Sequence, residues 1–483
     1  MQDQSKYEAV IGLEVHAQLS TASKLFSGDA TTFDAAPNTQ TSPISLAHPG
    51  TLPVMNEAVL ALAIKLGLAL KCQISSNTYF ARKNYFYPDL PKGYQVSQDS
   101  APICKAGFLE INTGTGTARK LSLNRIHIEE DAGKSLHDVS DANTCLDYNR
   151  AGVPLLEIVT EPCIHSAEEA FAFVTELRNL VRWLGVCDGN MEEGSMRCDA
   201  NISIRPKGDN NLYTRVEVKN LNSIRNVKRA IDLEVARLIA LTEAGEKIVQ
   251  ETRSYNADDH TSFSLRSKED AHDYRYFPEP DLPLFKITNA YIKEIQDAMP
   301  ALPNEVRQEL MSTFLLSAYD ATAITASKET TDYFFSLAAK QKNFKSVANW
   351  IVGPLKNYCT ENNRELHQLP ISINQISELI EFANSGQVHF NVASTKILEA
   401  LINEPSKSIL AIATGLDLLQ QRNEDVLEAW AKQVLSANPD KVAAYKKGKK
   451  ALLGMFAGEV KKLSKGQADM QATQQLLSKL LSE

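Results

Sequence analysis

The sequence predicts an α+β protein whose N-terminal part is built on an antiparallel β-sheet and whose remainder is helical. Three observations lead to this prediction. Short segments of alternating polar and apolar residues, separated by turn residues, fill residues 1–293 and are typical of antiparallel strands. Most of the 22 glycines lie in that stretch. From about residue 303 onward, apolar residues recur at helical spacing.

Within the sheet-rich part, we expect helices over residues 166–184 and 232–243. The proline-rich run of residues 278–283 can continue neither a helix nor a strand, so it closes this part of the chain. A weaker break lies near Pro405. We therefore predict three domains: an N-terminal domain at 1–293, a helical domain at 294–406 and a helical tail at 407–483.

The composition is that of a soluble globular protein, with 43% hydrophobic and 23% charged residues and a net charge of -8. Seven cysteines are scattered without a CxxC pair, as expected for reduced thiols in the cytoplasm. No segment reads as a signal peptide, and no apolar run approaches the roughly 20 residues that span a bilayer. We expect a cytoplasmic protein with no membrane association.

Several predicted strands carry an unusually polar face. Their two-residue period gathers His, Asp, Glu, Arg and Asn on one side. The residues singled out as ligands for a divalent metal are Glu14, His16, Glu129, Glu157 and Asp199. Carboxylate oxygens suit Mg²⁺, so one interpretation is a metal–phosphate site. The other is the ordinary solvent face of half-buried strands. Four further histidines are interpreted as surface or loop residues: His48, His137, His165 and His260.

Two segments mix cations with aromatic residues, at 82–94 and 266–277. Such mixtures suit phosphate pairing and base stacking, although aromatic side chains also serve simply to hold a loop against its domain. Neither a phosphate-binding Gly-x4-Gly-Lys-Ser/Thr loop nor a Gly-x-Gly-x-x-Gly motif occurs in the sequence, so a nucleotide site must be of an uncommon kind. No amidase-type serine cluster or glutaminase cysteine setting is recognisable either.

The tail contains a basic cluster. Between residues 441 and 465, eight lysines face one acidic residue, Glu459, in a chain that is acidic as a whole. Clustered lysines are the footprint expected of a contact with nucleic-acid phosphates, while the alternative is a solvated helix face. The residues proposed for this nucleic-acid contact are Lys446, Lys447, Lys449, Lys450, Lys461, Lys462 and Lys465.

Long runs of the sequence resemble the B subunit of the tRNA-dependent amidotransferases (the GatB family) over essentially the whole chain. The runs are Ile11-Gly-Leu-Glu-Val-His16, Arg82-Lys-Asn-Tyr-Phe-Tyr-Pro-Asp-Leu-Pro-Lys92, His127-Ile-Glu-Glu-Asp-Ala-Gly-Lys134, Asp147-Tyr-Asn-Arg-Ala-Gly-Val-Pro154, Asp188-Gly-Asn-Met-Glu-Glu-Gly-Ser-Met-Arg-Cys-Asp-Ala-Asn201, Val218-Lys-Asn-Leu-Asn-Ser223 and Ala271-His-Asp-Tyr-Arg-Tyr-Phe-Pro-Glu-Pro-Asp-Leu-Pro283. The resemblance implies a cradle-shaped N-terminal domain, a helical domain and a helical tail like that of the YqeY family.

The resemblance also implies an activity. The cradle would use ATP and Mg²⁺ to phosphorylate the side-chain carboxylate of Glu-tRNA(Gln), Asp-tRNA(Asn) or both. Ammonia from a separate amidase, the A subunit of a heterotrimer, would then displace the phosphate, and the small C subunit would wrap the other two. Carried over by motif, the residues Glu14, His16, Glu129, Glu157 and Asp199 hold metal, Lys83 pairs with phosphate, and Lys92 and Glu130 lie at the mouth of an ammonia channel.

One departure concerns zinc. Many relatives carry four cysteines in an FCxC…CPxC arrangement, whereas this chain has Phe26-Ser-Gly-Asp29 and Ser42-Pro-Ile-Ser45. Serine and aspartate cannot build a thiolate zinc site, so we predict no structural zinc.

Two other functions compete with this one. A non-catalytic tRNA-binding scaffold would explain the basic tail but not the polar strand faces. A metal-dependent hydrolase would explain the carboxylates but predicts turnover without ATP or tRNA.

Overall fold

The structure is a computed structural model that describes residues 6–113, 118–267, 274–420, 423–464 and 466–482. The chain divides into two compact units, Met1–Leu302 and Pro303–Glu483. The predicted α+β class, with the sheet first and the helices after it, is confirmed. Domain boundaries near residues 293 and 407 stay a prediction. Among the described residues, no helix is both long and apolar enough to cross a lipid bilayer.

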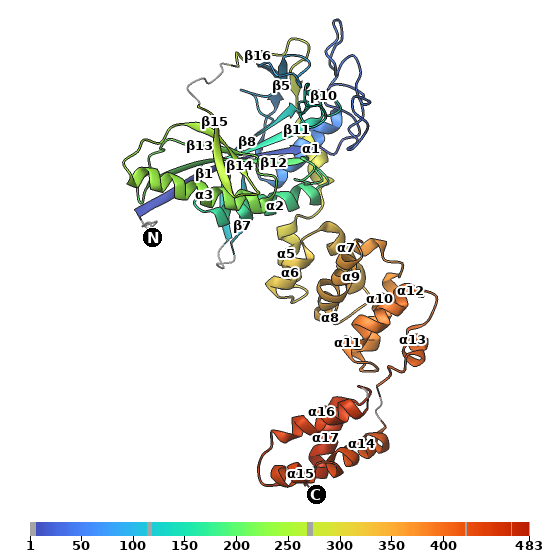
Figure 1. The fold of residues 1–483 in the computed structure, drawn as a ribbon. Helices are drawn as coiled ribbons and strands as arrows, with labels where there is room; N and C mark the ends of the chain where they lie inside the picture. The colour runs from blue at the N-terminus through green and yellow to red at the C-terminus, as the bar shows by residue number, and fades with distance from the viewer. Residues whose placement is uncertain (1–5, 114–117, 268–273, 421–422, 465, 483) are drawn as a thin grey trace. The chain divides into compact units, whose positions relative to one another are not determined.

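A ten-stranded sheet forms the centre of the first unit (Figure 1). Its strands are β1 (Tyr7–Gln18), β2 (Gln73–Ile74), β6 (Cys104–Lys105), β7 (Phe108–Asn112), β8 (Ala118–Glu130), β11 (Pro154–Thr160), β12 (Met196–Pro206), β13 (Val216–Lys219), β14 (Glu251–Asn256) and β15 (Thr261–Ser267). The strand order is β15-β14-β13-β12-β1-β11-β8-β6-β2, and β7 pairs with β8 outside this path. Strands far apart in the sequence are therefore neighbours in space.

The sheet has the predicted antiparallel pairing except at one pair, because β13 and β14 run parallel. The helix α3 (Ile224–Glu243) connects these two strands, and a parallel pair requires a crossover connection of this kind. The helix begins earlier than the predicted residue 232 because Ser223 caps it by accepting a hydrogen bond from the Asn226 N–H.

One face of the sheet is apolar and covered. Leu13, Val15 and Ala17 of β1 are fully buried. The helix α2 (Ala167–Trp183) confirms the predicted segment 166–184. It packs against α3 and β7, while α3 packs against β12. In Figure 1, α2 and α3 lie along the same side of the sheet. The opposite face keeps the polar residues of the central strands.

Smaller elements complete the first unit. The short strands are β3 (Asn77–Thr78), β4 (Ala81–Asn84), β5 (Tyr94–Ser97), β9 (Lys134–Leu136), β10 (Cys145–Asp147), β16 (Phe277–Pro278) and β17 (Phe285–Lys286), and the other helices are α1 (Glu57–Ala69) and α4 (Asn289–Asp297). The strands β16, β4 and β5 form a small sheet of their own, which carries Lys83.

The second unit is helical throughout its described residues. Its helices are α5 (Pro303–Ser312), α6 (Ala318–Ile324), α7 (Lys328–Ala338), α8 (Phe344–Trp350), α9 (Lys356–Glu361), α10 (Ile373–Asn384), α11 (Phe390–Val392), α12 (Leu398–Asn403), α13 (Ile409–Gly415), α14 (Glu424–Ser436), α15 (Pro439–Lys446), α16 (Leu452–Leu463) and α17 (Met470–Ser482). The helices α14 to α17 share a hydrophobic core that includes Leu427, Phe456 and Leu477. The tail therefore has a core of its own.

Candidate functional site

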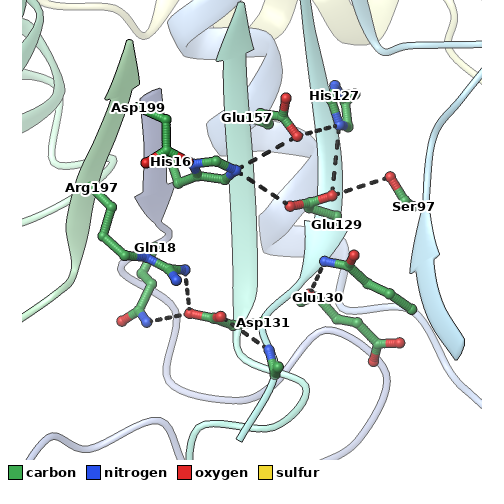
Figure 2. A network of polar contacts seen from close by, with 12 residues as sticks. His16, Gln18, Ser97, His127, Glu129, Glu130, Asp131, Glu157, Arg197 and Asp199 are labelled. Carbon is green, nitrogen blue, oxygen red and sulfur yellow. Dashed lines mark hydrogen bonds and ion pairs between the residues drawn. The ribbon is translucent and has the colours of Figure 1, made fainter. Parts of the chain in front are cut away.

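Four adjacent strands bring polar residues into one row on the open face of the sheet. His16 on β1 lies opposite Arg197 on β12 and opposite Glu157 on β11. Glu157 in turn lies opposite His127 on β8. Because residues paired directly across strands point to the same face, all four side chains project from one side of the sheet. Figure 2 shows His16, Glu157 and His127 converging with Glu129 of β8, while Arg197 reaches toward Asp131.

Three of the predicted metal ligands form a compact cluster. Ligand atoms of His16, Glu129 and Glu157 all lie within 4.8 Å of one another. His16 Nε2 is 3.6 Å from Glu157 Oε2 and 3.9 Å from Glu129 Oε1. His127 Nε2 lies 3.1 Å from the same Glu157 oxygen. Two buried carboxylates and an imidazole at this separation are a donor set that fits a divalent cation.

The pKa shifts of the two histidines agree with a site for a divalent cation. Burial alone would lower the pKa of His127, but its contacts with Glu129 and Glu157 raise that pKa to about 9. The pKa of His16 is also raised, because Glu157 and Glu129 outweigh the effect of burial. A proton on His127 thus helps to balance the buried carboxylates. A bound cation can take over that role, since metal binding displaces ligand protons.

Glu14 and Asp199 lie one step further along the sheet and outside the three-residue cluster. They are directly paired between β1 and β12. Asn201 Nδ2 donates to Glu14 Oε1 at 2.8 Å, and Lys219 Nζ donates to Asp199 Oδ2 at 2.5 Å. Burial and the nearby charge of Glu157 raise the pKa of Glu14. The predicted set of five ligands is thus split into a tight trio and an adjoining pair.

The trio and the pair line one cavity of about 670 Å³. Its walls hold seven carboxylates, from Glu14, Asp99, Glu129, Asp131, Glu157, Asp199 and Glu217. Among the described residues, only four side chains with a permanent positive charge face them, from Lys83, Arg125, Arg197 and Lys219. A cavity with this excess of negative charge disfavours phosphate unless bound cations compensate, so the charge balance also fits a divalent metal.

Lys83, predicted to pair with phosphate, lines the same cavity. Burial acts to lower its pKa, but the carboxylates of Glu129 and Glu157 raise it, so the side chain stays cationic. Its Nζ lies 5.0 Å from the centre of the Tyr274 ring. Tyr85 and Tyr274 meet edge to face with ring centres 6.0 Å apart. The aromatic residues of the two cation-rich segments thus pack on each other and also line the cavity, while residues 268–273 lie outside the described part.

Lys92 and Glu130 lie elsewhere. Glu130 follows Glu129 on β8 and therefore points to the other face of the sheet. Lys92 Nζ lies 2.5 Å from the Glu130 carboxylate, and both residues line a small separate cavity with Lys24 and Asp131. Asp131 lines both this cavity and the large one. The eight predicted catalytic residues therefore divide between two neighbouring cavities.

The positions of the missing cysteines come together around one carboxylate. Asp29 Oδ2 accepts hydrogen bonds from Ser27 Oγ at 3.0 Å and from Ser42 N and Oγ, both at 2.9 Å. Ser45 Oγ donates to the same oxygen. These hydrogen bonds lower the pKa of Asp29 although partial burial acts to raise it. The loop is thus held by a charged hydrogen-bond cluster.

The basic cluster of the tail is exposed. Lys446 ends α15, and Lys447, Lys449 and Lys450 follow it, while Lys461 and Lys462 lie in the last turn of α16. All six side chains are exposed, and Lys465 lies outside the described residues. Lys450 Nζ stands 4.2 Å above the Tyr445 ring, and Lys462 contacts Glu459.

The large cavity also contains charged residues that were not among the predicted site residues, including His127, Asp131, Arg197 and Lys219. His127 on β8 and Asp131, directly after the end of β8, continue the two-residue spacing of Glu129, so this period could have identified them. Arg197 Nη2 donates to Asp131 Oδ2 at 2.8 Å. Lys219 contacts Asp199 and Glu217. These partnerships join different strands, and no local pattern indicates them.

Comparison with known proteins identifies the family. A model of the GatB/GatE catalytic domain matches residues 9–293, and a model described as the GatB domain matches residues 332–481. The B subunit of the aspartyl/glutamyl-tRNA(Asn/Gln) amidotransferase of Thermodesulfovibrio yellowstonii is 44% identical over 99% of this chain and 100% of its own length. The proteins of the same name from Azotobacter vinelandii and Salinibacter ruber are 44% and 45% identical over 99% of this chain and 99% and 97% of their own lengths. The chain therefore belongs to the GatB family of amidotransferase B subunits.

Proposed function

We propose that this chain activates the side-chain carboxylate of Glu-tRNA(Gln), Asp-tRNA(Asn) or both by ATP-dependent phosphorylation and then exchanges the phosphate for ammonia. The observation that carries the proposal is the convergence of His16, Glu129 and Glu157 within 4.8 Å of one another in a cavity that also contains Lys83. Phosphoryl transfer depends mainly on positioning and on neutralising charge, and both require groups of these kinds.

The chemistry explains why ATP is needed. A carboxylate is a poor acylating agent because its leaving group would be oxide. Phosphorylation forms a bond between a carboxylate oxygen and the terminal phosphorus of ATP and releases ADP. Attack of ammonia on the carbonyl carbon then releases inorganic phosphate and leaves an amide.

The protein side chains have distinct tasks in this scheme. His16, Glu129 and Glu157 would hold a divalent cation such as Mg²⁺, with Glu14 and Asp199 beside them. When bound, the cation would neutralise phosphate charge in a cavity where carboxylates are in excess. Lys83 pairs with a phosphate oxygen. Arg197 and Lys219 hold Asp131 and Asp199 in place through contacts of 2.8 Å and 2.5 Å.

Ammonia would come from an amidase, the A subunit, with the small C subunit completing the heterotrimer. We assign Lys92 and Glu130 to the entry of ammonia. Support for this assignment is their ion pair in a cavity separate from the metal cluster. Asp131 borders both cavities and so marks the route between them.

The tail, residues 407–483, is proposed to bind the tRNA. Its support is the exposed group Lys446, Lys447, Lys449, Lys450, Lys461 and Lys462, together with Lys465 of the sequence. Exposed lysines bind phosphates by releasing condensed counterions and need no fixed geometry. The setting of the reaction is the cytoplasm, where aminoacyl-tRNAs are used.

The activation step can be tested without glutamine. Hydroxylamine replaces ammonia and captures an activated side chain as the hydroxamate. Hydroxylamine also cleaves the aminoacyl ester by itself, so only the hydroxamate of the side-chain carboxyl group is counted. We expect the assembled complex to form this side-chain hydroxamate from Glu-tRNA(Gln) or Asp-tRNA(Asn) only when ATP is present, with one ADP released for each. Asp199→Asn and Glu14→Gln in this chain should reduce both products together.

The competing function is a tRNA-binding scaffold that performs no chemistry, which the basic tail favours. It predicts normal tRNA binding and no effect of Asp199→Asn or Glu14→Gln on ADP release. Unchanged hydroxamate formation in both variants would select the scaffold and reject the activation proposal.

A further inference from the structure

The permanent cations that line the large cavity differ in their partners. Arg197 and Lys219 each form an ion pair with a carboxylate of the same cavity. Arg125 of β8 has no ion pair with a carboxylate among the residues that the structure describes. Its hydrogen bond goes to a neutral acceptor, Asn124 Oδ1, which lies 3.3 Å from Nη1. The positive charge of Arg125 is therefore available to an anion that enters the cavity.

Two buried nitrogen atoms of β8 have no hydrogen-bond partner among the described residues. They are Nε of Arg125 and Nδ1 of His127, and both residues line the large cavity. Figure 2 shows this ring nitrogen of His127 turned away from Glu129 and Glu157, which the other ring nitrogen contacts. Leaving a buried polar atom unpaired is costly, so two such atoms in successive positions of one strand face point to a ligand that pairs with them.

The charge around Arg125 also favours an anion. Lys105 of β6 lies directly opposite Arg125 in the sheet, and its side chain is exposed. Like charges directly opposite each other destabilise a strand pair, and an anion held against them offsets this cost. On the other side of β11, Glu14 and Asp199 make the same cavity acidic. The cavity therefore has a positive end at Arg125.

The substrate of the proposed reaction supplies a matching anion. In an aminoacyl-tRNA the α-carboxyl group is esterified, so the side chain carries the only free carboxylate of the amino acid. A guanidinium group offers two parallel N–H donors that fit the two oxygens of a carboxylate. Arg125 and His127 are about 7 Å apart along the strand, and Glu129 of the metal cluster follows at the same spacing. A carboxylate held by Arg125 thus lies beside the cluster.

We propose that Arg125 binds the side-chain carboxylate of the aminoacyl-tRNA and holds it, next to His127 Nδ1, for attack on the phosphate at the metal cluster. The inference rests on the proposed function, since it assigns the group that positions the carboxylate to be activated. Each carboxylate oxygen has two lone pairs, so it can accept a hydrogen bond from the guanidinium and still form the bond to phosphorus. ADP leaves with the electrons of the broken bond, and Arg125 keeps its protons throughout.

Phosphate groups are also ligands of arginine. We favour the carboxylate because the phosphates of ATP already have Lys83 and the metal cluster in this scheme, whereas the carboxylate has no other cationic partner. The phosphates of the tRNA backbone can bind over a wide surface, including the tail lysines. Ligands that share or lack the carboxylate distinguish these sources.

The first test measures binding to the assembled complex without ATP. Glu-tRNA(Gln) and Gln-tRNA(Gln) differ only in a side-chain carboxylate or amide, and Asp-tRNA(Asn) with Asn-tRNA(Asn) forms the equivalent pair. We expect the unsubstituted complex to bind the carboxylate ligand about 10- to 100-fold more tightly, the range for hydrogen bonds to a charged group. Arg125→Ala should abolish this preference, while affinity for the amide ligand and the thermal midpoint stay unchanged.

The second test measures ATP-dependent formation of the side-chain hydroxamate. Arg125→Ala should reduce it about 10- to 100-fold for the same reason. Free guanidinium at a low, non-denaturing concentration should restore part of the activity by replacing the lost group. Arg125→Lys keeps the charge but not the two parallel donors, so its ligand preference should be intermediate. The lysine variant also keeps the test valid if the alanine variant does not fold.

Arg119→Ala is the matched control. Arg119 also lies on β8, but it contacts Glu169 and the Cys163 carbonyl and does not line the large cavity. Its replacement should leave the ligand preference and hydroxamate formation unchanged. Guanidinium should not stimulate this variant.

Three results would overturn the proposal. The first is a full preference for the carboxylate ligand in the Arg125→Ala complex. The second is an equal loss of affinity for both ligands, which would place Arg125 against an RNA phosphate. The third is an unchanged ligand preference with weaker binding of inorganic tripolyphosphate and Mg²⁺, which would assign Arg125 to the nucleotide.

Failure of the proposed function would look different. The unsubstituted complex would then form no side-chain hydroxamate with ATP. If it still preferred the carboxylate ligand and Arg125→Ala removed that preference, the contact between Arg125 and the carboxylate would stand.

Discussion

The polar face of the sheet and the lysine cluster of the tail both concentrate charge, but they do so in different ways. On the sheet, strand register fixes each side chain, and His16, Glu129, Glu157 and His127 contact one another. In the tail, the six described lysines project from α15, α16 and the segment between them into solvent. Lys462 has one ion pair with Glu459 at 3.2 Å, between two exposed side chains.

The sheet cluster holds its groups in fixed positions, whereas the tail lysines attract a ligand through their summed charge. A cluster of buried, mutually contacting groups acts as a unit, so losing one member disturbs the others. Exposed charges act through their sum, so each loss has a small and graded effect. We therefore expect single substitutions to abolish activity at the sheet and to reduce affinity stepwise at the tail.

The largest effect is expected for Glu157→Gln. Glu157 contacts both histidines, and its pKa is lowered by them although burial opposes this, so it is a permanent anion. Replacing the carboxylate with a neutral amide should reduce ATP-dependent amidation by at least ~100-fold. Substituting a residue that contacts a metal ligand, rather than the metal itself, typically costs about 10–100-fold. Steady-state amidation and tRNA binding, measured on the same preparation, check this.

The matched control is Glu110→Gln. Glu110 is an exposed acid of β7 that pairs loosely with Lys120 at 3.6 Å. The Glu110→Gln substitution should leave amidation unchanged. Full amidation by the Glu157→Gln variant would mean that Glu157 is not part of the site. The distinction between the polar face of the sheet and the lysine cluster of the tail would then fail as well.

An intermediate effect is expected when Lys446, Lys447, Lys449 and Lys450 are replaced together by alanine. If each lysine binds a phosphate, the slope of log affinity against log salt should become shallower by about 0.7–0.9 for each phosphate that is no longer bound. Affinity for tRNA at low salt should fall by roughly tenfold or more. Titration of labelled tRNA at several salt concentrations measures both quantities.

Replacement of Lys293 and Lys328 serves as the comparison. Lys293 is exposed and Lys328 is half-buried, and both lie outside the tail with an aspartate partner four residues on. Their loss should leave the salt slope unchanged. Equal slopes in the tail variant and the unsubstituted chain would mean that the lysine cluster is only a solvated surface.

A smaller effect is expected at Asp29, whose carboxylate oxygen accepts hydrogen bonds from Ser27, Ser42 and Ser45. Asp29→Asn should lower the free energy of unfolding by about 1–2 kcal/mol, because hydrogen bonds to a charged group are lost. The pKa of Asp29 is lowered by these bonds, so its contribution is present above the ordinary value of 3.8 and is lost as the pH falls below it. Denaturant unfolding at pH 7 and pH 3 checks both the size and the sign.

Asp34→Asn, at an exposed position of the same loop, is the control and should be neutral. Metal analysis of the purified chain is a second test of what holds this loop in place. One bound zinc per chain would contradict the hydrogen-bonded cluster as the element that holds it.

The sequence predicted the fold and much of the large cavity for one physical reason. A strand places every second residue on the same face, so Glu14 and His16, or His127 and Glu129, are gathered by local geometry alone. The start of α5 at Pro303 likewise follows from local rules, since proline is favoured at the first helical position.

The parts of the fold and site that the sequence did not predict depend on which strands are neighbours in the sheet. Lys92 and Glu130 were expected at the mouth of an ammonia channel, but no strand pattern indicates that they pair with each other. Glu130 points to the opposite face of β8 from its neighbour Glu129 and pairs with Lys92 in another cavity. Lys219 reaches Asp199 only because β13 lies beside β12. The parallel pairing of β13 with β14 follows from the crossover through α3, which no strand pattern reveals.

The most direct test of the central claim is amidation by a complex rebuilt from this chain, its amidase partner and the small third protein of the heterotrimer. The reaction contains glutamine, MgATP and, in separate samples, Glu-tRNA(Gln) and Asp-tRNA(Asn). The account predicts Gln-tRNA, Asn-tRNA or both, formed only with ATP and lost when Glu157→Gln replaces the unsubstituted chain. Absence of product with both tRNAs, while the complex still binds them and hydrolyses glutamine, would contradict it.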